Sequence, residues 1–175
     1  MRSLKLLLTA FLISIPVFAL EVGEPLPSLE LSGKDGGRVD GTPFKSDLLR
    51  GKVTVIFYVD PDKKDLNEPF VERLKARKFD RSRYRSVAVI NMEATWMPNF
   101  AIAAALKSKQ KRYPDTIYVK DMVKKGVEVW QMADGDANIA VIDPKGTVIY
   151  ARSGKIPEEE FETILSIIER QIGKL

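Results

Sequence analysis

Cysteine and histidine are both absent from the 175-residue sequence. Without cysteine the chain can form no disulfide, no zinc–thiolate site and no thiol nucleophile, and thiol–disulfide exchange is excluded because it needs a thiolate. Without histidine it lacks the commonest general base, the usual transition-metal ligand and the central residue of a Ser-His-Asp triad. The sequence therefore predicts a protein that is not a thiol redox enzyme and that holds no cofactor.

Long apolar runs are also scarce, and the one that stands out lies at the N-terminus. Within residues 1–19, a positive start at Arg2 and Lys5 precedes a short apolar run that Pro16 interrupts. This pattern is typical of a secretory signal peptide, and it predicts cleavage after Ala19 and export to the periplasm. The alternative is a retained membrane anchor, but a spanning helix needs about 20 uninterrupted apolar residues. We therefore expect no stable membrane insertion after cleavage.

Neither sign of charge dominates. The 28 basic and 24 acidic residues give a formal net charge of +4, which removal of residues 1–19 would lower to +2. An exported protein of nearly balanced charge is a poor nucleic-acid binder. The basic run Lys107–Arg112 does not alter this, because cations are favoured at helix C-termini. A chain of this length can bury about 70% of its unfolded surface, so we expect a single domain over residues 20–175.

Predicted strands and helices alternate along the chain. Nearly continuous apolar, β-branched runs predict strands buried on both faces, and apolar residues at helical spacing predict amphipathic helices. The expected strands are 53–59, 86–92, 116–119, 138–142 and 147–151, and the expected helices are 65–77, 98–113 and one that starts at Pro157. The last two strands are expected to form an antiparallel hairpin.

Three further expectations concern strand pairing and core packing. Alternation at Leu29–Leu31, followed by the turn signal Lys34–Gly37, predicts an N-terminal β-hairpin. Trp130 lies in an alternating apolar run and is expected in the core. On helix 98–113 we expect four residues to pack inward, namely Phe100, Ala103, Ala104 and Leu106.

The order of these elements predicts the fold class. Strands joined through helices are expected to be parallel, and a closing hairpin adds antiparallel strands to the same sheet. The sequence therefore predicts a thioredoxin-like α/β fold, with a central mixed sheet flanked by helices and an N-terminal β-hairpin.

Six segments carry a resemblance to a known family: Gly51-Lys52-Val53, residues 91–100, residues 106–114, Trp130-Gln131-Met132, residues 141–146 and residues 153–157. Together they make residues 22–172 similar to the YtfJ-like family of periplasmic proteins, which is placed among thioredoxin-like folds. The resemblance implies an exported thioredoxin-like domain of poorly defined biochemical role.

The chain differs from redox thioredoxins at the positions of their two active-site cysteines and of their cis-proline. The positions of the Cys-x-x-Cys pair correspond to Asp62 and Asp65, or to Pro61 and Lys64 when counted back from the proline in the next helix. The cis-proline position aligns with Ala137, whose preceding peptide bond is expected to be trans, since a cis bond before a non-proline residue costs about 2.5–4 kcal/mol.

Three aspartates, Asp60, Asp62 and Asp65, cluster at the junction between strand 53–59 and the following helix. One interpretation is helix capping, in which carboxylates accept the free N–H groups of a helix start. The others are a hard-cation site or a carboxylate pair for acid–base chemistry. Capping is favoured, because every helix start offers unpaired donors.

The segment Asp134–Asn138 has the alternating oxygen ligands of a calcium loop. It is not an EF-hand, because Ile139 and Lys145 occupy the places that require glycine and glutamate. In a thioredoxin-like layout this loop is expected beside the acidic junction, where converging carboxylates would favour a cation. The calcium alternative uses Asp62, Asp65, Asp134, Asp136 and Asn138.

Residues 92–99 follow the second parallel strand, and ligands of α/β sheets tend to lie beyond the carboxyl ends of such strands. Two interpretations are open. Trp96, Met97 and Phe100 form a contact surface for a partner, or Trp96 packs under the loop and Pro98 starts a helix.

The sequence thus predicts a non-catalytic module that binds a periplasmic protein or peptide. The expected binding residues are Asp60, Asp62, Asp65, Thr95, Trp96, Met97, Asn99 and Asn138. The alternatives are a calcium-binding structural or sensor protein and, last, a hydrolase with paired aspartates, for which the chain shows no nucleophile or oxyanion motif.

Overall fold

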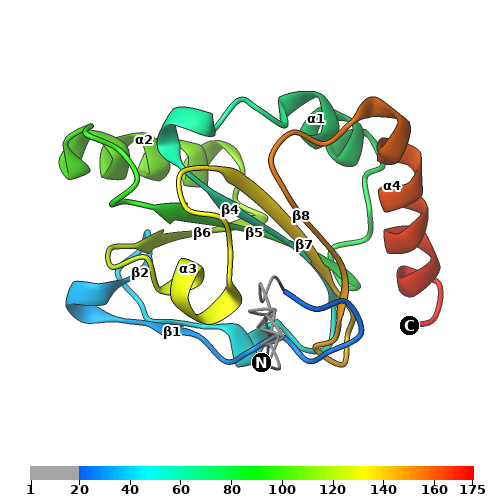
Figure 1. Cartoon of the computed structure of the whole chain (residues 1–175). Coiled ribbons are helices and arrows are strands. Elements are labelled where there is room, and N and C mark those ends of the chain that lie inside the picture. Colours follow the sequence, from blue (N-terminus) through cyan, green and yellow to red (C-terminus); the bar gives the residue numbers. More distant parts are fainter. Residues whose placement is uncertain (1–19) are drawn as a thin grey trace, which may run out of the picture.

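A six-stranded mixed sheet organises the chain (Figure 1). The structure is a computed structural model that describes residues 20–175, so the predicted signal peptide lies outside the described residues. The strands are β2 (Gly36–Arg38), β4 (Val53–Val59), β5 (Tyr84–Asn91), β6 (Thr116–Asp121), β7 (Ala137–Ile142) and β8 (Val148–Ser153). Their order in the sheet is β2-β6-β5-β4-β7-β8, with β4, β5 and β6 mutually parallel and the other three antiparallel to their neighbours. This is the predicted mixed sheet with its closing hairpin.

Helices and a small second sheet cover the two faces. Three helices, α1 (Glu68–Ala76), α2 (Asn99–Arg112) and α4 (Glu158–Ile172), lie on one face. The other face carries α3 (Lys125–Trp130) and the two-stranded sheet of β1 (Glu30–Leu31) and β3 (Phe44–Lys45) (Figure 1). Short 3-10 helices occupy Gly33–Asp35, Ser46–Leu49 and Pro61–Lys63. No helix within residues 20–175 is long and apolar enough to cross a membrane.

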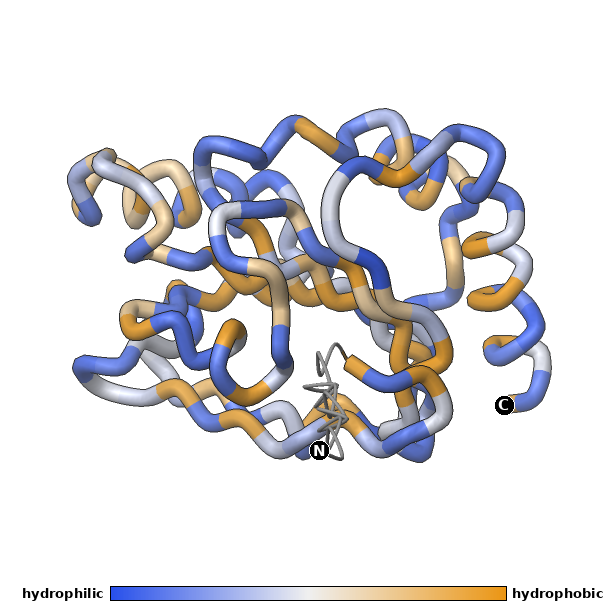
Figure 2. The backbone as a smooth tube through the Cα atoms, in the orientation of Figure 1, coloured by the Kyte–Doolittle hydropathy of each residue, from blue (hydrophilic) through white to orange (hydrophobic). Residues whose placement is uncertain are grey.

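The predicted helices and strands are confirmed, with small shifts at their ends. Apolar residues concentrate on the central strands, while the helices alternate apolar and polar residues around their axes (Figure 2). Pro69 lies at the start of α1, where its missing N–H costs no helical hydrogen bond. Trp130 is fully buried, as expected, but at the end of the short helix α3 rather than in a strand-like run.

The N-terminal part differs in its pairing. An antiparallel two-stranded sheet does form, but β1 pairs with β3 instead of pairing across the turn Lys34–Gly37. Beyond this turn the chain continues into β2, which joins the edge of the main sheet beside β6. A side chain at Gly36 would overlap the carbonyl oxygen of Lys120, so this close backbone approach requires glycine.

Two packing expectations need correction. Strand β5 was predicted to be buried on both faces, but Ser86, Ala88 and Ile90, which face the helices, are only half-buried. On α2 the buried residues are Ile102 and Leu106, whereas Phe100 and Ala104 are exposed and Ala103 is half-buried. Ile102 and Leu106 are four residues apart and therefore share one face, and Phe100 lies nearly opposite Ile102 around the helix axis.

Candidate functional site

Three segments meet at the carboxyl edge of the sheet, where β4 and β5 end. The backbone N–H of Asp60, after β4, donates to the carbonyl of Asp136 at 3.0 Å. The side-chain amide of Asn91, the last residue of β5, donates to the Asp134 carboxylate at 3.0 Å. The predicted neighbourhood of the acidic junction, the loop after β5 and the loop before β7 is therefore present.

The capping interpretation is confirmed for Asp60. Its carboxylate accepts the N–H of Asp62 at 2.8 Å and caps the 3-10 helix Pro61–Lys63. The side chain is 5% exposed, so Asp60 cannot contact a partner and is removed from the predicted binding residues. Asp62 and Asp65 are exposed and remain available for contact.

Asn138 is likewise a structural residue. It is 1% exposed, and its amide group donates to the carbonyls of Tyr58 and Ala133 and accepts from the Ala133 N–H and the Ser153 hydroxyl. All of its hydrogen-bonding capacity is used within the fold, so it offers nothing to a partner or a cation. The peptide bond before the adjacent Ala137 is trans, as expected.

A second buried amide was not recognised in the sequence. Asn67, just before α1, donates to the carbonyl of Gly154 at 3.1 Å and accepts the N–H of Ile156 at 2.8 Å. It fastens the start of α1 to the connection between β8 and α4. Asn67 falls inside the predicted helix 65–77. In the structure it precedes α1, but its side chain makes no cap hydrogen bond and serves this long-range contact instead.

The carboxylates do not converge into a cation site. Within residues 20–175 no group of three or more acidic side chains is placed to hold a metal ion. The Asp134 carboxylate pairs with the Lys124 ammonium at 2.8 Å, and hydrogen bonding to Lys124 lowers the pKa of Asp134 below its usual value. Asp136 accepts the N–H of Ala137 at 2.8 Å. The predicted calcium ligands Asp62, Asp65, Asp134, Asp136 and Asn138 are therefore separate groups with separate partners or with solvent.

The loop after β5 resolves the two interpretations of Trp96. Its side chain is 88% exposed, so the packing alternative is wrong, although Pro98 does precede α2 as that alternative also stated. Phe100, in the first turn of α2, is 78% exposed, and Asn99 between Pro98 and Phe100 is exposed as well. We call Trp96, Asn99 and Phe100 the aromatic edge.

Thr95 and Met97, the other two expected binding residues of this loop, determine its conformation. The Met97 N–H donates to the Thr95 hydroxyl at 3.2 Å, which forms a local turn. Met97 is half-buried and packs against the cluster that contains Ile102 and Leu106. Thr95 and Met97 thus hold the loop so that Trp96, which lies between them, points outward.

The chain matches the model of a family described as bacterial proteins of unknown function (YtfJ_HI0045) over residues 29–171. It belongs to this family. It is 22% identical over 180 residues to the uncharacterized protein YtfJ of Escherichia coli (strain K12), covering 96% of this chain and 98% of that protein. It is 27% identical over 161 residues to an uncharacterized protein of Haemophilus influenzae, covering 85% of each.

Solved structures establish the fold. A thioredoxin-like superfamily protein superposes with a TM-score of 0.61 at 19% identity, covering 85% of this chain and 97% of that one. At this identity the likeness concerns the fold alone. The chain is therefore a thioredoxin-like module of the YtfJ family without any cysteine.

Proposed function

We propose that this protein is an exported binding module that holds a protein or peptide partner of the periplasm through the aromatic edge. Trp96 carries the proposal, because a tryptophan that is 88% exposed leaves a large apolar surface in water. Burial of apolar surface stabilises a complex by roughly 25 cal/mol per Å², and tryptophan is enriched among the residues that dominate binding energy.

The surroundings support this role. The aromatic edge lies beyond the carboxyl end of β5, where α/β sheets commonly place ligands. Phe100 adds a second exposed ring, and Asn99 supplies a polar group between Pro98 and Phe100. The half-buried Met97 anchors the loop, so the presented surface is held in shape before a partner arrives, which lowers the entropic cost of binding.

Site-specific photocrosslinking tests the proposal. A photoreactive amino acid is placed at position 96 in cells that produce the protein, and in a parallel strain at position 48. Leu48 is also exposed, at 59%, but its carbonyl accepts a hydrogen bond from Arg85 at the start of β5, away from the aromatic edge. We expect one recurrent periplasmic partner from position 96 and none in common with position 48.

The partner is then purified and its affinity measured with variants. Trp96→Ala and Phe100→Ala are each expected to weaken binding about tenfold or more, whereas Leu48→Ala leaves it unchanged. All three side chains are exposed, so unfolding midpoints should match the parent protein. Equal affinity of the parent and both aromatic variants, or the absence of any recurrent crosslink from position 96, contradicts the proposal.

A further inference from the structure

The helical face of the sheet is packed in two separate parts. One cluster of buried residues joins α1 and α4 to β4 and β7, and includes Phe70 and Phe161. The other joins α2 to the sheet and includes Ile102 and Leu106. Between α1 and α2 lies a groove of about 670 Å³, which is within the range of about 300–1,000 Å³ that is usual for small-ligand sites.

Strand β5 forms the floor of this groove. Ser86, Ala88 and Ile90 line it and are half-buried, although β5 is paired on both sides and lies in the interior of the sheet. On the opposite face of the same strand, Val87 and Val89 are fully buried. The small side chains at 86 and 88 leave the floor open where a covering helix would otherwise pack.

The walls beside this floor are mixed. Charged side chains of α1 and of the turn before it line one wall, namely Lys63, Lys64, Asp65, Glu68 and Lys75, beside apolar side chains. Phe57 lines the groove from β4 and Leu106 from α2. Because both edges of β5 are occupied by β4 and β6, no peptide can bind here by adding a strand. The apolar side chains at the floor, Phe57, Ala88, Ile90 and Leu106, therefore fit an unbranched hydrocarbon chain, which needs no hydrogen bonds.

One end of the groove is basic. Where α1 and α2 stop, Lys78, Arg81, Lys109 and Arg112 line it, opposed by the single carboxylate of Asp115. Asp115 pairs with Arg81 at 3.7 Å. Among residues 20–175, Lys78, Lys109 and Arg112 form no ion pair.

Helix dipoles do not account for this many cations. Each helix C-terminus carries roughly half a negative charge, so the two helix ends and Asp115 together offset about two of the four positive charges. An excess of positive charge remains beside an apolar floor. Such a site favours a ligand with an anionic head and an apolar tail.

We propose that the groove between α1 and α2 binds a long-chain fatty acid. The carboxylate lies among Lys78, Lys109 and Arg112, and the hydrocarbon chain extends over Ser86 and Ala88 toward the carboxyl end of β5. The head-group site lies at the amino end of β5, whereas the aromatic edge follows its carboxyl end and does not line the groove, so either proposal can fail without the other.

Titration of the purified protein with oleate below its micellar concentration tests the proposal. We expect saturable binding of one oleate per chain. Octanoate and the dodecyltrimethylammonium ion are the comparison ligands, since the first has too short a tail and the second has the opposite charge. Binding of either as tightly as oleate, or oleate binding that never saturates, overturns the proposal.

Matched variants of α2 locate the head group. Lys109→Glu with Arg112→Glu is expected to weaken oleate binding about tenfold or more. The control is Lys107→Glu with Lys111→Glu, which reverses the same charge on the same helix at positions that do not line the groove and should change affinity by less than about twofold. All four side chains are exposed, so both variants should fold. Equal weakening by the two pairs shows a non-specific charge effect and overturns the site.

A substitution in the floor tests the tail. Ala88→Leu projects into the open groove and should reduce oleate affinity about tenfold, with the unfolding midpoint measured in parallel. If this variant is as stable as the parent and binds oleate equally well, the hydrocarbon chain does not lie over β5 and the proposal is wrong.

Discussion

The Tyr58 hydroxyl donates a hydrogen bond of 3.1 Å to the carboxylate of Asp121 beneath the sheet. The same carboxylate accepts the backbone N–H groups of Lys125 at 3.0 Å and Gly126 at 2.7 Å, at the start of α3. Asp121 is fully buried, and these donors compensate for the loss of water around it. A six-residue helix is too short to be stable alone, so this carboxylate and the buried Trp130 hold α3 in place.

Substitution of Tyr58 and substitution of Asp121 should lower the free energy of unfolding by unequal amounts. Tyr58→Phe deletes one hydrogen bond and should lower the free energy of unfolding by about 1 kcal/mol. Asp121→Ala leaves several buried donors without an acceptor, at about 1–3 kcal/mol for each group, so we expect a loss of about 3 kcal/mol or more. Urea unfolding measures both. A loss for Asp121→Ala no larger than that for Tyr58→Phe would show that water replaces the carboxylate.

Gly126 is required by the close approach of α3 to Tyr58. A Cβ at position 126 would overlap the Tyr58 ring, and even the Cζ atom of the ring would be only 2.8 Å away. Alanine normally favours a helix over glycine by about 1 kcal/mol, but here overpacking should cost about 1–3 kcal/mol. We expect Gly126→Ala to lower the urea midpoint. The control is Gly173→Ala after α4, whose Cβ would meet its nearest atom at 3.5 Å, and which should be neutral.

The main strands and helices could be predicted because their apolar patterns are local. The run Val53–Val59 is β4 to the residue, and the predicted helix 98–113 contains α2. Helix α3 and strand β2 could not be predicted in the same way. Helix α3 depends on the carboxylate of Asp121. Strand β2 contains Gly36 and Gly37, which have low strand propensity, and it is a strand only because it pairs with β6.

The candidate site was predictable in its location and less so in its members. Strand order alone brings the ends of β4 and β5 together, and the cap at Asp60 follows from its position before a helical turn. Whether Asn138 faces solvent depends on where Ser153 and Ala133 lie, which no local pattern encodes. The sequence placed Phe100 both in the core of helix 98–113 and in a possible contact surface, because the apolar residues of α2 allow more than one helical phase. The burial of Ile102 and Leu106 decides the phase and leaves Phe100 exposed.

Alkaline pH should destabilise the fold through buried tyrosines. Burial raises the pKa of Tyr84 to about 12, against about 10 for an unfolded tyrosine. Above pH 10 the unfolded chain loses this proton while the folded chain keeps it, so the free energy of unfolding falls as pH rises, by about 1.4 kcal/mol per pH unit for one such group. Burial and the charge of Asp121 raise the pKa of Tyr58 in the same direction.

Urea unfolding at several pH values measures this slope. Between pH 10 and 12 the parent should lose stability more steeply than Tyr84→Phe, which has no proton to release at that position. The Tyr84 hydroxyl also contacts the Ser86 hydroxyl at 2.6 Å, so the comparison uses the slope with pH and not the stability at one pH. Parallel slopes for the two proteins would contradict an elevated pKa of Tyr84.

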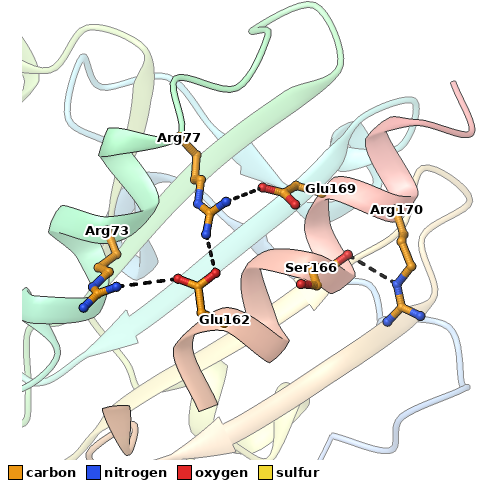
Figure 3. A network of polar contacts seen from close by, with 6 residues as sticks. All are labelled: Arg73, Arg77, Glu162, Ser166, Glu169 and Arg170. Atoms are coloured by element: carbon orange, nitrogen blue, oxygen red, sulfur yellow. Dashed lines mark hydrogen bonds and ion pairs between the residues drawn. The ribbon is translucent and has the colours of Figure 1, made fainter. Parts of the chain in front are cut away.

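Charged and apolar contacts both join α1 to α4. Arg77 bridges Glu162 and Glu169, and Arg73 lies 3.6 Å from Glu162 (Figure 3). Beneath this network the rings of Phe70 and Phe161 pack edge to face, with centroids 5.4 Å apart. The ion pairs are exposed to solvent and screened by salt, whereas the aromatic pair is buried.

The aromatic pair should therefore contribute more to the free energy of unfolding than the ion pairs do. Phe161→Ala is expected to lower the free energy of unfolding by about 3–5 kcal/mol, at low and high salt alike. Arg77→Gln should have a much smaller effect, which disappears in molar sodium chloride. An effect of Arg77→Gln that persists at high salt would show that the network contributes through packing of the arginine stem as well as through charge.

Calcium should leave stability unchanged. A ligand at free concentration c that binds only the folded state raises the free energy of unfolding by RT ln(1 + c/Kd), and with it the unfolding temperature, so millimolar calcium would reveal even a weak site. The Asp134 carboxylate is held by Lys124 and Asn91, and the Asn138 amide is fully used within the fold. Calcium binding would have to break these contacts, and among residues 20–175 no group of three acidic side chains is placed to compensate for them. Thermal unfolding with calcium, with magnesium and with chelator should give one midpoint. A rise with calcium alone that Asp134→Asn abolishes would show that the acidic loop rearranges around the ion.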